Sequence, residues 1–204
     1  MLTLNHKNEF SFKQSMKRFI VFEGIDASGK ETQAKLLSSF LKNKGFEVLL
    51  THEPIYDEPI GKIIRLNLDK RISLASETVA MLYAADRHEH YLKIKKALDE
   101  NKIVISDRYK YSNMAYQGAN GVDPKWIQEI ERYSEDPDIV FYIRVNPESA
   151  MTRRKEKDLY EENINFQKKV FDIYEELSKK YKFVVIDGQK SIEDIHKEVI
   201  KYLL

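Results

Sequence analysis

Short apolar runs alternate with longer amphipathic segments from about residue 18 to the end of the chain. Five runs have the length and apolar content of buried strands, at 19–22, 47–51, 102–107, 139–145 and 183–187. Between them, apolar residues at helical spacing predict helices at about 31–44, 59–68, 76–100, 123–133, 161–180 and beyond 191, with a further start at 146–147. Residues 108–120 are predicted to form a helix or a helical loop. This alternation predicts an α/β fold, a five-stranded parallel sheet with helices on both faces.

The length of the chain indicates its domain organisation. Its 204 residues suffice for one α/β domain with a sizeable core and are too few for two. Residues 1–17 are polar and lack a periodic pattern, so we interpret them as an N-terminal extension. We therefore predict a single domain over residues 18–204.

The composition argues against several classes of protein. The 34 basic and 33 acidic residues nearly cancel, so nothing favours a nucleic-acid or membrane surface as partner. The absence of cysteine excludes disulfides, thiolate metal sites and a cysteine nucleophile. No apolar run approaches the roughly 20 residues of a membrane span, and the N-terminus lacks a signal-peptide core. We expect a cytoplasmic protein.

The first apolar run leads into a turn with the spacing of a phosphate-binding loop. Gly24, Gly29 and Lys30 match the pattern G-x-x-x-x-G-K. Glycines let successive N–H groups point at phosphate oxygens, the following helix adds its positive end, and Lys30 adds a full charge. The motif predicts a P-loop NTPase. We expect ATP to bind the loop and the start of the helix, at Gly24, Ile25, Asp26, Ala27, Ser28, Gly29, Lys30, Glu31 and Thr32.

The last position of this motif departs from the common pattern. Ser or Thr normally supplies a hydroxyl to Mg²⁺ there, whereas this chain has Glu31 and then Thr32. A helix turns about 100° per residue, so Thr32 cannot simply replace the missing hydroxyl. Incidental glycines in a strand–turn–helix are the alternative, but the flanking strand and amphipathic helix favour a nucleotide site.

Polar residues at other strand ends and on one helix are candidates for the remaining chemistry. Asp107 ends the third apolar run, where an acid can hold Mg²⁺ directly or through water; the alternative is a cap of the next helix. The guanidinium groups of Arg65, Arg87 and Arg108 suit phosphate oxygens. Tyr83 and Arg87 share a helix face, where they can bind a base together, or Tyr83 can be core that Arg87 covers.

Three blocks in order resemble the thymidylate kinase family: FIVFEGIDASGK at 19–30, LYAADR at 82–87 and DRYKYSNMAYQ at 107–117. The resemblance runs from about Lys17 to the C-terminus. It implies a fold like that of nucleoside monophosphate kinases. It also implies transfer of the γ-phosphoryl group from ATP to dTMP, which yields ADP and dTDP, with Mg²⁺ as cofactor and a homodimer as the assembly.

The resemblance implies roles for residues that face the base and sugar of dTMP. Asp26 matches the acid that contacts the sugar 3′-hydroxyl. Tyr83 matches the aromatic residue, commonly Phe, that stacks on thymine, and Arg87 matches the arginine at a thymine carbonyl. Asn113 and Tyr116 match the face that meets the base edge and crowds the sugar 2′ position, so Tyr116 would favour deoxyribose.

The resemblance also implies residues that bind the phosphates. Arg65 and Arg108 match the arginines on the acceptor phosphate, and Gln117 completes the third block. Residues 152–162 match the family's lid, which brings a cation to the transferring phosphoryl group when the phosphate loop has no variable basic residue. The lid candidates are Arg153, Arg154, Lys155 and Lys157; the alternative is a solvated charged helix end. The predicted catalytic set is Lys30, Asp107, Arg108, Arg153 and Arg154, with Asp107 at the metal.

Some features depart from the family or leave alternatives open. The segment 51–54 reads THEP where the family pattern is Thr-Arg-Glu-Pro. The following loop, 55–58, lacks the usual glycines and is one residue longer than in the family. His88 and His90 lie two apart on a helix and do not share a face, so we interpret both as surface residues.

Two alternatives to a thymidylate kinase stay open. One is a related kinase for another nucleotide or a deoxynucleoside, and the other is a non-catalytic nucleotide-binding protein.

Overall fold

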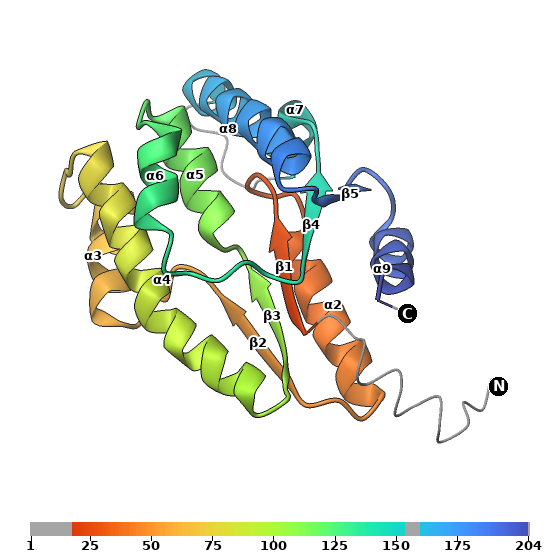
Figure 1. Cartoon of the computed structure of the whole chain (residues 1–204). Helices are drawn as coiled ribbons and strands as arrows, with labels where there is room; N and C mark the ends of the chain where they lie inside the picture. The colour runs from red at the N-terminus through yellow and green to blue at the C-terminus, as the bar shows by residue number, and fades with distance from the viewer. Residues whose placement is uncertain (1–17, 154–159, 204) are drawn as a thin grey trace.

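The computed structural model describes residues 18–153 and 160–203, which form one parallel sheet with surrounding helices (Figure 1). The strands are β1 (Phe19–Glu23), β2 (Val48–His52), β3 (Ile103–Asp107), β4 (Ile139–Arg144) and β5 (Val184–Asp187). Their order across the sheet is β2-β3-β1-β4-β5, and each pair is parallel. The predicted α/β fold with a five-stranded parallel sheet is confirmed. The predicted N-terminal extension and most of the predicted lid lie outside the described residues.

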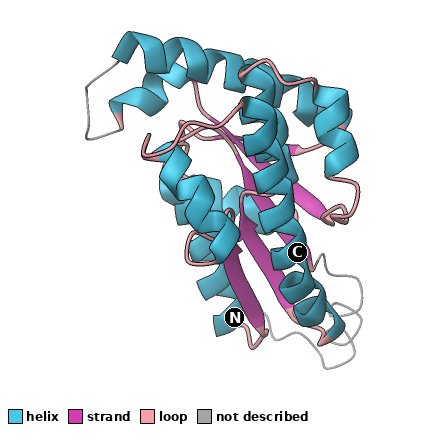
Figure 2. Cartoon of the chain, turned by 90° about the vertical axis from the view of Figure 1, so that its left-hand side faces the viewer, coloured by secondary structure: helices cyan, strands magenta, loops and turns pink. Residues whose placement is uncertain are grey.

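Helices cover both faces of the sheet, as the alternating pattern predicts (Figures 1 and 2). One face carries α2 (Lys30–Asn43) and α9 (Ile192–Lys201), which contact each other. The other carries α4 (Ser76–Asp99), α5 (Lys110–Ala119) and α8 (Tyr160–Lys180), packed in that order. Three further helices lie beside these: α3 (Pro59–Leu68) on α4, α6 (Pro124–Ile130) on α5, and α7 (Pro147–Thr152) on α8.

Strand β1 lies at the centre of the sheet because its sequence is apolar almost throughout. All its residues are buried, and Ile20, Val21 and Phe22 have no exposed surface. A strand that is covered on both sides has no solvent face, so an unbroken apolar run replaces alternation. The Phe22 ring stacks on Phe141 of β4 with centroids 5.3 Å apart. Burial of each such side chain stabilises the fold by about 1.5–3 kcal/mol.

Helix ends mostly follow their sequence signals. Ser191 caps α9, since its hydroxyl accepts from N of Asp194 at 3.1 Å. The predicted extent of the helix after Asp123 was wrong, because α6 ends at Ile130 and not at residue 133. The chain there tightens into i→i+3 turns, with N of Ser134 donating to O of Glu131 at 3.0 Å.

The carboxyl ends of β1, β2 and β3 meet at one edge of the sheet. The register pairs Asp107 with Phe22 on one side and with His52 on the other. The pairing continues past the strands: N of Glu53 donates to O of Asp107 at 3.1 Å, and N of Arg108 to O of Phe22 at 2.9 Å. Ligands of open parallel sheets bind at this edge, so the loops that begin here carry the candidate site.

Candidate active site

The loop between β1 and α2 is tightly curled. Gly24 has φ of +151°, and a Cβ there would lie 2.8 Å from O of Ile143. Ala27 at φ 60° and Gly29 at φ 95° also adopt left-handed conformations. Such a curl turns successive N–H groups inward. Gly29 gives α2 no side-chain cap, so the first amides of the helix remain available to an anion.

Lys30 lies buried under this loop. Its Nζ donates to O of Ile25 at 3.2 Å. Burial and the nearby charge of Arg108 lower the pKa of Lys30 to about 8, and Asp107 opposes the shift. At pH 7 the ammonium is still protonated, because the pH lies below this pKa, and a phosphate beside it would raise the pKa again.

Arg153 reaches the phosphate loop from the start of the predicted lid. Its Nη2 donates to O of Gly188 at 3.0 Å, and its Nη1 lies 3.5 Å from O of Ala27 and of Ser28. This position holds a guanidinium over the loop. The other lid candidates, Arg154, Lys155 and Lys157, lie outside the described residues.

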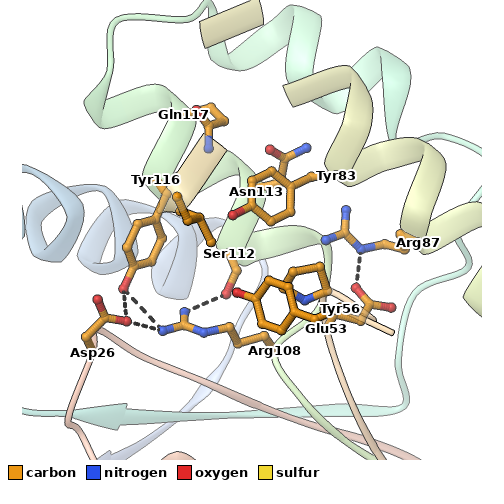
Figure 3. Close-up of a pocket in the computed structure, with 12 residues that line it drawn as sticks. Asp26, Glu53, Tyr56, Tyr83, Arg87, Arg108, Ser112, Asn113, Tyr116 and Gln117 are labelled. Atoms are coloured by element: carbon orange, nitrogen blue, oxygen red, sulfur yellow. Dashed lines mark hydrogen bonds and ion pairs between the residues drawn. The ribbon is translucent and has the colours of Figure 1, made fainter. Parts of the chain in front are cut away.

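Arg108 and Asp26 form an ion pair between the phosphate loop and the end of β3 (Figure 3). Nη2 of Arg108 lies 2.5 Å from Oδ1 of Asp26, and the hydroxyl of Tyr116 donates to the same oxygen at 2.8 Å. Arg108 has φ of 71°, an uncommon conformation for a residue with a side chain. Burial alone would lower the pKa of Arg108, but Tyr116 and Asp26 raise it above its ordinary value, so the guanidinium stays charged.

A pocket of about 200 Å³ opens beside this ion pair. It is lined by predicted substrate residues from the phosphate loop, α4, the end of β3 and α5: Asp26, Tyr83, Arg87, Arg108, Asn113, Tyr116 and Gln117. Figure 3 shows the rings of Tyr83 and Tyr116 and the guanidinium of Arg87 around it. The structure thus brings together residues that lie up to about ninety positions apart in the sequence, such as Asp26 and Tyr116.

Arg65 is not among the residues that line this pocket. Its side chain is 57% exposed and pairs with Asp69 at 3.1 Å. Its guanidinium also lies over the ring of Tyr56, with 5.4 Å between Cζ and the ring centroid. Tyr56 itself lines the pocket. Sequence reasoning missed Tyr56, although it lies in the loop 55–58, which departs from the family pattern.

A buried charge cluster holds Arg87. Its Nε donates to Oε2 of Glu53 at 2.6 Å, and its Nη1 donates to Oε1 of Glu131. His90 belongs to the same cluster, with Nδ1 3.0 Å from Oε1 of Glu53 and Nε2 2.8 Å from Oγ1 of Thr51. The prediction that His90 is a surface residue was therefore wrong. Its side of α4 faces the end of β2, which helical spacing alone does not reveal.

Glu23 is a second residue that sequence reasoning missed. Its Oε1 accepts from N of Tyr109 at 2.9 Å, and its Oε2 accepts from Oγ of Ser112 and from the hydroxyl of Tyr174, both at 2.7 Å. Burial raises the pKa of this carboxyl, while these hydrogen bonds oppose the shift. Oγ of Ser112 also accepts from Nη1 of Arg108 at 3.0 Å. Glu23 therefore supports Arg108 through Ser112. The available signal was a single acid at the end of an apolar run.

Asp107 and Glu31 face a second cavity of about 430 Å³, which Arg108 also lines. Oδ1 of Asp107 is buried and has no hydrogen-bond partner among the described residues. Burial raises the pKa of Asp107, Lys30 lowers it and Glu31 raises it. Glu31 is exposed and pairs with Lys35 at 2.6 Å, and Thr32 is also exposed.

The donor set fits Mg²⁺ better than a metal held by protein alone. Over residues 18–153 and 160–203, no cluster of three or more His, Cys, Asp or Glu side chains is arranged to hold a metal. Mg²⁺ at a nucleotide site usually takes one or two carboxylates and completes its shell with water and phosphate oxygens. The unpaired oxygen of Asp107 meets that need.

Comparison with known proteins assigns the family. The sequence profile described as thymidylate kinase matches residues 22–199. The chain belongs to the thymidylate kinase family. It is 47% identical over 186 residues to the "Probable thymidylate kinase" of Methanocaldococcus jannaschii, a match that covers 91% of this chain and 95% of that protein. It is 38% identical over 185 residues to the "Thymidylate kinase" of Plasmodium falciparum, a match that covers 90% of this chain and 88% of that protein.

A solved thymidylate kinase has the same fold. The crystal structure of the enzyme from Ehrlichia chaffeensis matches with a TM-score of 0.74 and 35% identity, over 91% of this chain and 97% of that one. Thymidylate kinases are phosphotransferases that convert dTMP to dTDP, so the predicted family, fold and enzyme class are confirmed. Among the helices in the described ranges, none is both long and apolar enough to cross a bilayer.

Proposed function

We propose that ATP and dTMP bind on either side of Arg108, with the ATP phosphates on residues 24–32 and dTMP in the pocket of about 200 Å³. The observation that carries this proposal is the Arg108–Asp26 pair, which joins the phosphate loop to the pocket wall at 2.5 Å. A guanidinium at that junction can neutralise charge on the phosphoryl group that passes between the two nucleotides.

Five side chains suit the base and sugar of dTMP. Tyr83 offers a ring for stacking, and Arg87 and Asn113 offer polar groups to the base edge. Tyr116 and Asp26 share a hydrogen bond of 2.8 Å, and we propose that they face the sugar, where the Tyr116 ring excludes a 2′-hydroxyl. We assign Arg108 to the acceptor phosphate, with Arg65 and Gln117 at the edge of the site.

The chemistry requires alignment and charge neutralisation. The nucleophile is an oxygen of the dTMP phosphate, which is already ionised at pH 7, so no strong general base is needed. Lys30 and Arg108 neutralise charge on the transferring phosphoryl group, and Arg153 reaches over the phosphate loop. Arg154 is the second lid candidate. Closure of the lid over the site would exclude water and prevent wasteful hydrolysis of ATP.

We propose Asp107 as the residue that holds Mg²⁺, directly or through water. Mg²⁺ held there would supply positive charge that offsets the charge of the phosphates. Glu31 lies beside this site in place of the usual hydroxyl, and its charge acts on Asp107 by raising the pKa of that carboxyl. Glu31 therefore tunes the metal site of this chain.

We further propose a homodimer that associates through α3 and α4. These helices carry large apolar side chains that are 41–54% exposed: Ile63, Leu68, Met81 and Leu92. Exposed apolar groups that gather on neighbouring helices are typical of an interface. Light scattering after gel filtration tests this, and a monomer at micromolar concentration contradicts it. The cytoplasmic location and the absence of a nucleic-acid partner stay predictions from composition.

The decisive experiment is coupled ADP release with ATP, Mg²⁺ and a panel of dTMP, dUMP, UMP, CMP, AMP and GMP, beside a reaction without acceptor. Turnover with dTMP well above the others supports the assigned roles of Tyr83, Arg87 and Tyr116. A different preferred acceptor contradicts these roles. ATP binding without turnover contradicts the proposed catalytic set.

A further inference from the structure

Glu131 joins the two polar residues that face the base edge. It follows α6, is 2% exposed, and lies outside the three blocks that resemble the family. Its Oε1 accepts from Nη1 of Arg87, which lies on α4, and from Nδ2 of Asn113, which lies on α5, at 2.7 Å in the second case. One buried carboxylate oxygen thus orients side chains from two helices.

The hydrogen bonds of Asn113 determine which way its amide points. Its Nδ2 donates both hydrogens, one to O of Ala80 at 3.0 Å and one to Glu131. Both partners only accept, so a flipped amide would set its oxygen against two acceptors. Oδ1 of Asn113 is buried and has no partner within the described part of the chain. Asn113 lines the pocket, so this oxygen is the acceptor that its side chain would present to a bound base.

Arg87 supplies the complementary donor. Its Nε donates to Glu53 and its Nη1 donates to Glu131. The N–H groups of Nη2 therefore remain for a ligand in the pocket that Arg87 lines. Two carboxylates beside one guanidinium also offset its charge. Arg87 therefore presents a directed donor to a neutral group, whereas Arg108 supplies charge to phosphate.

We propose that Glu131 sets the base specificity of the pocket as a positioning residue. It holds Arg87 as a donor beside Asn113 as an acceptor, the complement of a pyrimidine with C4=O and N3–H. Cytosine and its derivatives carry an amino group at C4 and an unprotonated N3, so both pairs would be mismatched. Buried polar groups without partners make such a mismatch costly. The inference rests on the proposed binding of the dTMP base in this pocket.

Calorimetric titration with dTMP and with 5-methyl-dCMP tests this, because the two ligands differ only in the groups at C4 and N3. The wild type should prefer dTMP, by up to the order of 10⁴-fold seen for sites built to hydrogen-bond their ligand. E131Q should reduce this preference at least about tenfold, since a glutamine can donate as well as accept and so removes one of the two acceptors that fix the orientation of the Asn113 amide. E131D keeps a carboxylate and should restore part of the preference. E129Q, a neighbouring exposed position, should leave it unchanged.

If Glu131 had a purely structural role, its substitution would weaken the binding of dTMP and of 5-methyl-dCMP by the same factor. An unchanged ratio of the two dissociation constants in E131Q, or an equal loss for both, therefore overturns the inference. Should E131Q not fold, as judged by circular dichroism, E131D carries the test, and its shortened carboxylate must reduce the ratio by more than the experimental error. Y83A tests the placement of the base separately: unchanged dTMP binding in Y83A contradicts the proposed pocket, whereas weakened binding beside an unchanged E131Q ratio rejects only the role of Glu131.

Discussion

Arg108 and Asp26 lie 82 positions apart in the chain, yet Nη2 of Arg108 donates to Oδ1 of Asp26 at 2.5 Å. The pairing of β1 with β3 causes this contact, because it aligns Phe22 with Asp107 and so sets the next residues of both strands side by side. The same guanidinium reaches Ser112 and the hydroxyl of Tyr116. Arg108 is thereby held in a left-handed backbone conformation by four separate contacts, including O of Gly24.

We expect R108K to lower kcat/KM for dTMP by about 10²-fold or more, the scale seen when one transition-state donor is removed. Lysine keeps the charge but loses the planar fork that contacts several partners at once. Steady-state kinetics measure the effect. R132K, at an exposed arginine that contacts Tyr133, is the matched control and should behave as wild type. A loss below about threefold in R108K, against that control, contradicts the role.

We expect ATP binding at pH 9 to take up close to one proton at Lys30. In the free protein the pKa of Lys30 is lowered to about 8, so most of the ammonium is deprotonated at pH 9, and bound phosphates raise the pKa above that pH. Calorimetry in two buffers of different ionisation enthalpy measures the uptake. At pH 6.5 it should vanish. K35M should keep the uptake, because Lys35 is exposed; heats at pH 9 that do not depend on the buffer contradict the prediction.

The same shift has a consequence for stability. Between pH 8 and the ordinary lysine value of 10.5, the unfolded chain binds more protons at this position than the folded one. The free energy of unfolding therefore rises with pH across this window through Lys30. Urea denaturation of wild type and K30M at pH 7.5 and 9.5 measures it. The slope should be smaller in K30M, and equal slopes would argue against a buried, shifted lysine.

We expect E31T to bind Mn²⁺, a spectroscopic substitute for Mg²⁺, several-fold more tightly in its complex with ADP. The substitution supplies the usual hydroxyl ligand, and this added ligand outweighs the loss of a negative charge near the metal. Electron paramagnetic resonance measures the free metal directly. E31Q removes the charge without adding a hydroxyl ligand and should bind Mn²⁺ no more tightly than the wild type. Weaker binding in both variants would instead make Glu31 itself a ligand.

We expect G61A to weaken dTMP binding more than ATP binding. Gly61 lies in α3, and a Cβ there would lie 1.9 Å from O of Ile55, so the segment that carries Glu53 and Tyr56 must move. Overpacking of this kind costs about 1–3 kcal/mol. Urea denaturation and dTMP titration measure both effects. G45N is the control, since no atom lies within 4 Å of a Cβ at Gly45 and asparagine tolerates its conformation. Unchanged dTMP affinity in G61A contradicts the prediction.

The local features of this protein could be predicted from its sequence. An unbroken apolar run predicts the central strand β1, because a strand covered on both faces has no polar side. The spacing of Gly24, Gly29 and Lys30 predicts the phosphate loop, because a tight turn into a helix needs those residues. The edge of the sheet where Asp107 lies follows from the parallel order of the strands.

Only the tertiary structure could decide which buried polar residues support the site. Glu23, Glu53 and Glu131 each occupy an ordinary position in the sequence, and their roles come from partners on other elements. His90 shows the limit most clearly: helical spacing separates it from His88, but only the contacts with Thr51 of β2 and with Glu53 explain why His90 is buried while His88 is exposed. Sequence periodicity reports which residues share a face, whereas the cost of burying a charge is met by partners that the fold brings from far along the chain.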